Sequence, residues 1–188
     1  DAIIVNQDEF IKPNSSLEKL ATLRTVFKKD GTVTAGNASG LNDGAAAMLV
    51  VSEEALKKYN LKPKARIVTS AVVGVEPKVM GIGPVYATKK ALQKAGLKLS
   101  DMDVMEFNEA FSTQALACTR QLGLEDDDPR INPNGGAIAI GHPLGMSGTR
   151  IVQAATNELI RTGCRYALAT MCVGVGMGYA VIIENATI

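Results

Sequence analysis

The stretch Asn132-Pro-Asn-Gly-Gly-Ala-Ile-Ala-Ile-Gly-His-Pro-Leu-Gly-Met-Ser-Gly148 contains the only histidine of the chain, His142, set between a glycine and a proline. An apolar run precedes the histidine, and residues 149–161 follow an amphipathic, helix-like pattern. This order predicts a strand or extended segment, then a tight loop, then a helix. We expect His142 to face whatever lies beyond the loop, with helix N–H groups pointing the same way. A lone histidine is more often packed or exposed than catalytic, so its role depends on the rest of the chain.

Length and composition favour one globular domain, or one and a half, because the chain has 188 residues of which 46% are hydrophobic. The formal net charge is +1, and acidic and basic residues are interspersed. The sequence contains no block of like charge of the kind that forms a nucleic-acid-binding arm or an acidic tail. No apolar run approaches the roughly 18 residues that a membrane span needs. We therefore expect neither a nucleic-acid partner nor a membrane span.

The three cysteines, Cys118, Cys164 and Cys172, do not have the spacing of a metal site. With one histidine and no C-x-x-C pair, a zinc site made by this chain alone is not expected. Free thiols in a reducing, cytoplasmic setting are the simpler interpretation. Cys118 and Cys164 are expected to behave as small buried hydrophobic residues.

The chain begins Asp1-Ala-Ile-Ile-Val5, without Met and without the basic segment that opens a signal peptide. We expect no signal peptide, and we expect the chain to be a piece of a longer protein.

Strands and helices are predicted to alternate along the chain, because Val- and Ile-rich runs alternate with amphipathic segments. Strands are expected at residues 45–51, 65–74, 104–107, 166–171 and 179–183. Helices are expected from Ser15 or Ser16 through Leu23, from Ser52, at 85–95 before Gly96, at 112–122 and at 149–161. Loops are expected at residues 32–44 and 75–84. This alternation predicts an α/β domain built in layers.

Three chemically useful residues, Asn108, His142 and Cys172, are expected just after strands or in the loops that join them, where ligands of such sheets gather. A thiol and an imidazole suit acyl-thioester chemistry, because imidazole can activate a thiol and a thiolate can attack or move a proton. The Asn108 amide can orient a water or donate to an oxyanion. Glycines after Cys172 let backbone N–H groups approach a bound carbonyl. Glu109 is either a supporting carboxylate or merely a helix-start acid.

Four motifs together resemble the thiolase family. Asn108-Glu-Ala-Phe111, Asn134-Gly-Gly-Ala-Ile-Ala-Ile-Gly-His-Pro143 and Cys172-x-Gly-x-Gly-x-Gly178 look like its three C-terminal signatures. Residues 32–44, which could otherwise be an ordinary surface loop, resemble its coenzyme A-contacting loop. The resemblance covers the chain from about Lys12 on. It implies an α/β, thiolase-like layered fold with a mixed sheet covered by helices.

The resemblance also implies roles for the catalytic candidates. His142 would activate a nucleophilic cysteine and, with a water held by Asn108, stabilise the thioester oxygen. Cys172 would be the second catalytic cysteine, an acid/base that takes a proton from the thiol of coenzyme A or from the acetyl α-carbon. The Gly174 N–H would contribute to a second oxyanion hole.

Coenzyme A and acyl-CoA are implied as substrates, with no covalently bound cofactor and no metal. The residues implied to contact the pantetheine arm are Ser39 and Ala35, and those implied to line the acyl end are Met80, Ala110 and Phe111. Lys12 falls where the family often places a basic residue near the nucleotide phosphates.

Family members carry the acylated cysteine in an N-terminal half, and no segment here matches that motif. The chain therefore resembles a C-terminal half. Residues 1–41 would end the loop domain, residues 42–62 would give the last strand and helix of the N-terminal domain, and residues 63–188 would form the C-terminal domain. Alone it is expected to be inactive, and its expected partners are the N-terminal half and, as a dimer or tetramer, further copies.

The resemblance implies thiolysis of a 3-oxoacyl-CoA to acetyl-CoA and a shortened acyl-CoA, or the reverse condensation. The Val-Gly-Val-Gly pattern of residues 173–176, with His142-Pro-Leu-Gly-Met-Ser-Gly148 and the acidic residues 125–128, looks more like the 3-oxoadipyl-CoA thiolases of aromatic-compound breakdown. Acetoacetyl-CoA thiolases, many of which have Gly in place of Val175, and general 3-oxoacyl-CoA thiolases of β-oxidation stay alternatives. A non-catalytic acyl-CoA- or lipid-binding domain is disfavoured by Asn108, His142 and Cys172 occurring together. A ketoacyl synthase is disfavoured by Asn108 and Cys172.

Overall fold

The fold was obtained as a computed structural model that describes residues 3–8 and 10–188, so Asp1, Ala2 and Glu9 of the expected loop-domain piece lie outside the described residues. The helices are α1 (Leu17–Ala21), α2 (Glu53–Lys58), η1 (Pro77–Ile82), α3 (Gly83–Ala95), η2 (Leu99–Asp101), α4 (Ser112–Gln121), α5 (Ala137–Ile140) and α6 (Ser147–Thr162). The strands are β1 (Ala65–Gly74), β2 (Val104–Phe107), β3 (Tyr166–Val173) and β4 (Met177–Asn185).

The four strands form one mixed sheet in the order β1-β4-β3-β2. β2 and β3 run parallel, with Phe107 opposite Thr170, and the other two pairs are antiparallel. The parallel pair is joined through α6, as a parallel crossover requires. The expected α/β fold with a mixed sheet covered by helices is confirmed.

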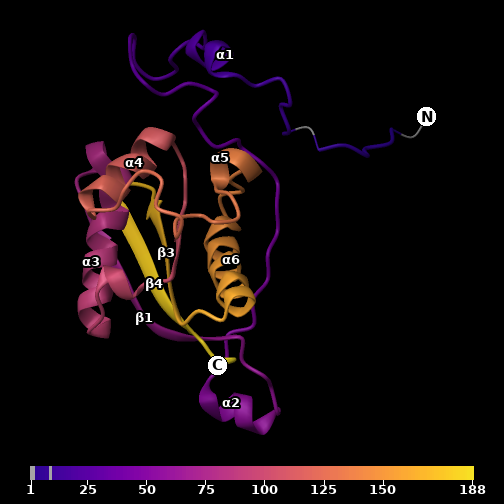
Figure 1. The fold of residues 1–188 in the computed structure, drawn as a ribbon, viewed down its shortest axis with the longest axis vertical. Helices are drawn as coiled ribbons and strands as arrows, with labels where there is room; N and C mark the ends of the chain where they lie inside the picture. The colour runs from indigo at the N-terminus through magenta and orange to yellow at the C-terminus, as the bar shows by residue number, and fades with distance from the viewer. Residues whose placement is uncertain (1–2, 9) are drawn as a thin grey trace.

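Helices cover both faces of the sheet (Figure 1), with α3 and α4 on one side and α6 on the other. Successive residues of a strand point to opposite faces, so β2 contributes to two cores. Met105 and Phe107 belong to the core on the α3 side, whereas Val104 packs with Ile151 and Leu159 of α6. The sheet therefore separates two chemical environments, and each site residue belongs to one of them.

Helix α3 shows why local signals predicted these elements well. Pro84 stands in its first turn, where a missing N–H costs nothing. Gly96 ends the helix with φ of +66°, a conformation that glycine adopts without strain. β1, at residues 65–74, coincides with the predicted strand.

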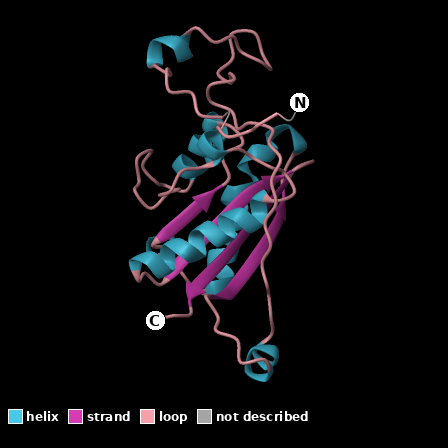
Figure 2. Cartoon of the chain, turned by 90° about the vertical axis from the view of Figure 1, so that its right-hand side faces the viewer, coloured by secondary structure: helices cyan, strands magenta, loops and turns pink. Residues whose placement is uncertain are grey.

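Residues 45–51 were expected to form a strand, and this prediction is wrong for the chain as described. The segment has no strand assignment and pairs with no strand among the described residues, and Leu49 is 76% exposed. A strand is stabilised by hydrogen bonds to a neighbouring strand, and this segment instead runs past α6, whose Gln153 donates to the Ala47 carbonyl at 2.7 Å. Figure 2 shows the long connection that leads from there to the separate α2, which Ser52 caps as predicted.

Three further elements differ from the sequence prediction. Residues 137–140, expected to be a strand or extended segment before His142, form the short helix α5. Residues 77–82 form a 3₁₀ helix where a loop was expected. β3 runs to Val173, so Cys172 lies within the strand and not after it. Among the helices of the described ranges, none combines the length and the apolar character that crossing a bilayer requires.

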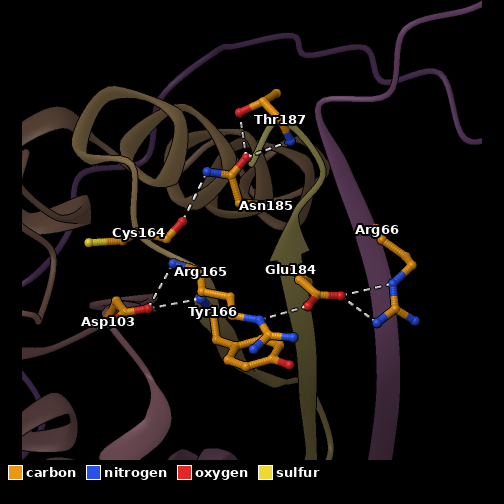
Figure 3. A network of polar contacts seen from close by, with 8 residues as sticks. All are labelled: Arg66, Asp103, Cys164, Arg165, Tyr166, Glu184, Asn185 and Thr187. Carbon is orange, nitrogen blue, oxygen red and sulfur yellow. Dashed lines mark hydrogen bonds and ion pairs between the residues drawn. The ribbon is translucent and has the colours of Figure 1, made fainter.

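A polar network holds the sheet together at the end where β2 and β3 begin (Figure 3). Glu184 of β4 accepts hydrogen bonds from Nε of Arg66 at 3.0 Å and from Nε of Arg165 at 2.9 Å. The Asp103 carboxylate accepts from the backbone N–H groups of Arg165 and Tyr166, each at 2.9 Å. These contacts tie together the end of the sheet at which β1, β2 and β3 begin and β4 finishes. The candidate functional residues lie at the other end of the strands.

Candidate active site

Asn108 and His142 are in direct contact at the edge where β2 and β3 end. The Asn108 backbone N–H donates to the Thr170 carbonyl at 3.0 Å, which extends the parallel pairing by one residue. Its side chain is buried, and its Nδ2 lies 3.3 Å from Nε2 of His142. The loop after α5 carries His142 to this place. Two of the three candidate residues are thus brought together as predicted.

Ser147, the first residue of α6, fixes the proton on the His142 ring. Its hydroxyl lies 2.6 Å from Nδ1 of His142 and donates to the Pro143 carbonyl at 3.0 Å. A hydroxyl has a single proton, so Ser147 must accept from Nδ1–H. The tautomer assigned from this network leaves the lone pair on Nε2, facing the Asn108 amide. Sequence reasoning gave Ser147 no role, although its place five residues after His142 at a helix start was visible.

His142 is a neutral base in this environment. Burial lowers the pKa of its imidazole, and the positive charge of Arg150 on α6 lowers that pKa further. Near pH 7 the ring is therefore uncharged, and Nε2 can take a proton from a neighbouring acid.

Glu109 supports the histidine loop, which is the segment of residues 132–146 that includes α5 and His142. Its Oε1 accepts from Nδ2 of Asn132 at 2.6 Å, and its Oε2 accepts from the backbone N–H of Ile138 at 3.2 Å. A Cβ on Gly136 would lie 2.0 Å from the Glu109 carboxyl carbon, so the glycine permits this close approach. The open choice between a supporting carboxylate and a helix-start acid is settled for the first, since Glu109 precedes α4 but binds the loop.

Cys172 reaches the same edge of the sheet from the other face. It is the penultimate residue of β3 and pairs with Gly178 of β4. Strand alternation places its side chain with that of Leu168 on the α3 side, whereas Asn108 lies with Val104 on the α6 side. No hydrogen bond joins Cys172 to His142 among the described residues. Burial raises the pKa of the Cys172 thiol, so it is protonated at neutral pH.

Gly174 lies in the tight turn between β3 and β4, which is held in an unusual conformation. Val175 has φ of +60° and is 83% exposed. A β-branched residue in this left-handed region is a strained outlier. The Gly176 carbonyl accepts from the Val75 N–H at 2.8 Å, which ties the turn to the end of β1. The turn is therefore held in place although its tip is open to solvent.

Cys118 belongs to the apolar core on the α3 side of the sheet. It is buried on α4, its thiol donates to the Gly81 carbonyl at 3.2 Å, and burial raises its pKa to about 11. The prediction that Cys118 is a small buried residue is confirmed. Cys164 is partly buried just after α6.

The expected coenzyme A loop lies against two of the three signature segments. The N–H and the hydroxyl of Ser39 both donate to the Ala110 carbonyl, at 3.0 and 3.2 Å. Ala38 forms a β-bridge with Phe111. The backbone N–H of His142 donates to the Gly40 carbonyl at 3.2 Å. Residues far apart in the chain thus meet where the loop, Asn108 and His142 come together.

A cavity of about 720 Å³ lies beside this loop. Its walls include Lys12, Lys19 and Ala35, and they also include Ile138 and Ala139 of α5. Lys12 and Ala35, predicted separately to contact coenzyme A, therefore share one hollow. Met80 does not line it and lies in η1, half-buried. Within the described part of the chain, no three His, Cys, Asp or Glu side chains are grouped to hold a metal ion.

Comparison with known proteins identifies this arrangement. Residues 61–185 match the thiolase C-terminal domain, and residues 1–54 match the thiolase N-terminal domain. The chain belongs to the thiolase family.

Similar thiolases come from several organisms. The chain is 56% identical to the beta-ketoadipyl-CoA thiolase of Acinetobacter baylyi over 185 residues, which are 98% of this chain and 46% of that protein. It is 56% identical to the 3-oxoadipyl-CoA/3-oxo-5,6-dehydrosuberyl-CoA thiolase of Escherichia coli over 181 residues, 96% of this chain and 45% of that protein. The crystal structure of human mitochondrial 3-ketoacyl-CoA thiolase superimposes with a TM-score of 0.91 at 55% identity, over 96% of this chain and 45% of that one, and the same enzyme has been solved in complex with CoA. The chain thus spans about half the length of the thiolases that it matches.

Proposed function

We propose that this chain is the C-terminal half of a thiolase that cleaves a 3-oxoacyl-CoA with coenzyme A, or catalyses the reverse condensation. The observation that carries the proposal is the placement of His142 between Ser147 and Asn108. Ser147 holds the proton on Nδ1, and burial with the Arg150 charge keeps the ring neutral, so Nε2 is ready to take a thiol proton. The N-terminal half of the protein supplies that thiol, on its nucleophilic cysteine.

The reaction runs in two steps. His142 takes the proton of the nucleophilic cysteine, and the thiolate attacks the 3-oxo carbon of the substrate. The bond between C2 and C3 breaks, and the protonated Cys172 thiol gives its proton to C2, which releases acetyl-CoA. The Cys172 thiolate then takes the proton of the coenzyme A thiol, whose sulfur attacks the acyl-cysteine. The shortened acyl-CoA leaves, and the protonated His142 returns its proton to the departing cysteine thiolate, which restores both groups.

Stabilisation of the oxyanions falls to hydrogen-bond donors, of which the His142 Nε2–H is present once the ring has taken the thiol proton. We assign Asn108, through a bound water, and His142 Nε2–H to the thioester oxygen in one step. We assign the Gly174 N–H, next to the Cys172 segment, to the second oxyanion hole. Preorganised donors of this kind act strongly because they need no reorientation when the charge forms.

The proposed coenzyme A site runs along the loop of Ala35 and Ser39. Ser39 lies against Ala110, and Lys12 and Lys19 border the adjoining cavity, where their charges suit nucleotide phosphates. We assign Phe111 and Met80 to the acyl end. Coenzyme A acts as substrate in this scheme, and no bound cofactor takes part.

The proposed organisation follows the division into residues 1–41, 42–62 and 63–188, from loop domain to C-terminal domain. The exposed apolar residues 48–51 support a tight fit to the missing N-terminal half. We further propose a dimeric or tetrameric assembly of the complete protein and a cytoplasmic location.

We propose 3-oxoadipyl-CoA as the substrate. Two of the relatives at 56% identity carry ketoadipyl-CoA or oxoadipyl-CoA names, but the human 3-ketoacyl-CoA thiolase is 55% identical. Identity therefore barely favours one class, and a general or acetoacetyl-CoA thiolase is the second candidate.

The test uses the protein joined to its N-terminal half. Thiolysis of 3-oxoadipyl-CoA and of acetoacetyl-CoA is followed by loss of substrate and release of acetyl-CoA, with His142→Asn as the matched inactive variant. We expect turnover that the variant loses, with higher kcat/KM for 3-oxoadipyl-CoA. Binding of acyl-CoA without turnover would instead establish the non-catalytic domain, and preference for acetoacetyl-CoA would establish the second candidate.

A further inference from the structure

Glu106 lies two residues before Asn108, on the same face of β2. Residues two apart on a strand point to the same side, so Val104, Glu106 and Asn108 all face α6. The Glu106 side chain is 1% exposed in a four-residue strand that is otherwise apolar. A carboxyl group is rarely buried to this extent without a partner.

Three oxygen atoms in this place lack a hydrogen-bond donor. Both carboxyl oxygens of Glu106 and the Oδ1 of Asn108 are buried, and no described residue donates to them. Two groups with only lone pairs cannot bond each other, and each buried acceptor left alone costs about 1–3 kcal/mol. One proton on the Glu106 carboxyl changes this, because it turns an acceptor into an O–H donor.

The charged groups around Glu106 leave it without a direct ion pair. On α6, Arg150 makes no hydrogen bond to Glu106, and its own Nε and Nη2 are buried without acceptors among the described residues. Glu158, also on α6, pairs with Arg161 and accepts from Asn134. Burial raises the Glu106 pKa to about 7, against the effect of Arg150 and with that of Glu109 and Glu158.

The other elements that pack on Glu106 bring no partner either. Across the sheet, β3 places Ala169 opposite it, and the next residue is the uncharged Thr170. On the side of β2 away from β3, where Met105 pairs with Ile131, the Arg130 guanidinium is paired with Asp128. Glu109 binds the histidine loop, and the neutral His142 contacts Asn108 and Ser147. A neutral carboxyl is the state that these surroundings favour.

We propose that Glu106 is a positioning residue that acts as a neutral carboxylic acid and donates its O–H to Oδ1 of Asn108, directly or through one water. This bond turns the NH₂ group of Asn108 toward Nε2 of His142, in the orientation that keeps Nε2 as the base. The chemical role of that base rests on the proposed thiolase function, whereas the protonated carboxyl is a property of the fold.

Loss of the proton reverses the polarity of this chain of contacts. An ionised Glu106 can only accept, so it draws the Asn108 NH₂ group toward itself and leaves Oδ1 facing Nε2. An acceptor at that position favours a protonated ring nitrogen, and His142 then cannot take the thiol proton. Activity should therefore fall as the pH rises through the pKa of Glu106.

Two substitutions separate donation from packing. Glu106→Gln keeps the shape and offers an N–H donor that does not ionise. It should retain kcat near neutral pH and lose the fall in kcat that the Glu106 ionisation causes at higher pH. Glu106→Leu removes the donor and should lower kcat roughly tenfold or more with little change in KM. Thr88→Val is the control, because it also removes a buried polar group that has no hydrogen-bond partner among the described residues, but on α3. It should leave kcat and KM unchanged.

An activity-free measurement decides the protonation itself. Isotope-edited infrared spectroscopy of the complete protein with labelled glutamate should show a protonated carboxyl band at pH 6 that is absent from Glu106→Gln and present in Thr88→Val. Absence of that band from the wild-type chain would overturn the proposal, even if Glu106→Leu failed to fold. Coincident pH profiles of wild type and Glu106→Gln would also overturn it, with thiolysis itself intact. If the complete protein shows the band but cleaves no 3-oxoacyl-CoA, the thiolase function and the catalytic part of this proposal are wrong. The neutral state of the Glu106 carboxyl would still be supported.

Discussion

The imidazole of His142 donates from Nδ1 to the Ser147 hydroxyl over 2.6 Å, and that hydroxyl donates onward to the Pro143 carbonyl. Two consecutive bonds therefore settle which ring nitrogen is basic. A serine at the first position of α6 thus holds the imidazole in one tautomer, as the carboxylate does in a Ser-His-Asp triad, without adding a charge.

Ser147→Ala should leave the fold intact and slow acylation of the nucleophilic cysteine in the complete protein. The ring would no longer be held in one tautomer, and we expect a loss of roughly tenfold or more in kcat. The measurement is the rate of alkylation of that cysteine together with kcat and KM. Ser100→Ala, on the exposed η2, is the control. Equal acylation rates in Ser147→Ala and wild type would show that Ser147 does not orient the base.

Gly136→Ala should destabilise the histidine loop. The new Cβ would lie 2.0 Å from the Glu109 carboxyl carbon, so the loop or Glu109 must move, at a cost of roughly 1–3 kcal/mol in the free energy of unfolding. Urea denaturation measures this loss. Gly145→Ala is the matched control in the same stretch, because no heavy atom lies within 4 Å of its added Cβ. A similar small effect of both substitutions would mean that Glu109 does not support the loop.

Cys172→Ser should cut turnover of the complete protein by roughly a hundredfold or more, because the variant loses the proton carrier of both steps. Acylation of the nucleophilic cysteine should proceed, since that step depends on His142. Mass spectrometry of the acylated protein and a thiolysis assay measure the two separately. Cys164→Ser, outside the site, should match wild type. Undiminished thiolysis by Cys172→Ser would remove Cys172 from the mechanism.

Glu184→Gln should weaken the sheet in a pH-dependent manner. Hydrogen bonds from Arg66 and Arg165 lower the pKa of the Glu184 carboxyl below its usual value. A depressed folded-state pKa stabilises the fold above the unfolded value of about 4.3, and the effect disappears as the pH falls through the folded value. The free energy of unfolding of wild type should therefore exceed that of the variant by up to about 1 kcal/mol at pH 7, and the two values should converge in acid. Denaturation curves between pH 7 and acid measure this difference in unfolding free energy, with Glu54→Gln on α2 as the control. A difference that does not change with pH would exclude the ion pairs of Glu184 as its cause.

The sequence predicted the elements whose signals are local. A Val- and Ile-rich run predicted β1, and Gly96 and Pro84 predicted α3, because caps and strand formers act within a few residues. The motifs predicted the Asn108–His142 contact, since each stands where a ligand-facing loop follows a buried segment.

Elements that depend on distant partners were predicted less well. Residues 45–51 have the composition of a strand, but the described chain offers no neighbouring strand to pair with them. The Ala-Ile-Ala-Ile run of α5 fits a helix or a strand, and the contact of Glu109 with the Ile138 N–H secures the helical turn. A four-residue run carries too little periodicity to decide this alone.

Supporting residues of the site were hardest to find. Ser147 stands only five residues after His142, but the contact of its hydroxyl with Nδ1 depends on how the intervening loop folds. Glu106 is proposed to act on Asn108, two residues along on the same face of β2, and its burial becomes visible only when α6 is placed. The available signal was slight, an acid inside the four-residue buried strand Val104–Phe107. Such a residue reads as an exception to apolar patterning until the neighbouring helix is placed.

The bond from the His142 N–H to the Gly40 carbonyl makes ligand binding and base positioning thermodynamically linked. A molecule that occupies the adjoining cavity and shifts residues 35–40 also changes the free energy of the histidine loop. By thermodynamic linkage, the position of this loop changes the binding free energy of the molecule by the same amount. Under the proposed function, occupancy by a pantetheine arm should tighten the imidazole against the Asn108 amide, and a poorly fitting ligand should leave the base less well held.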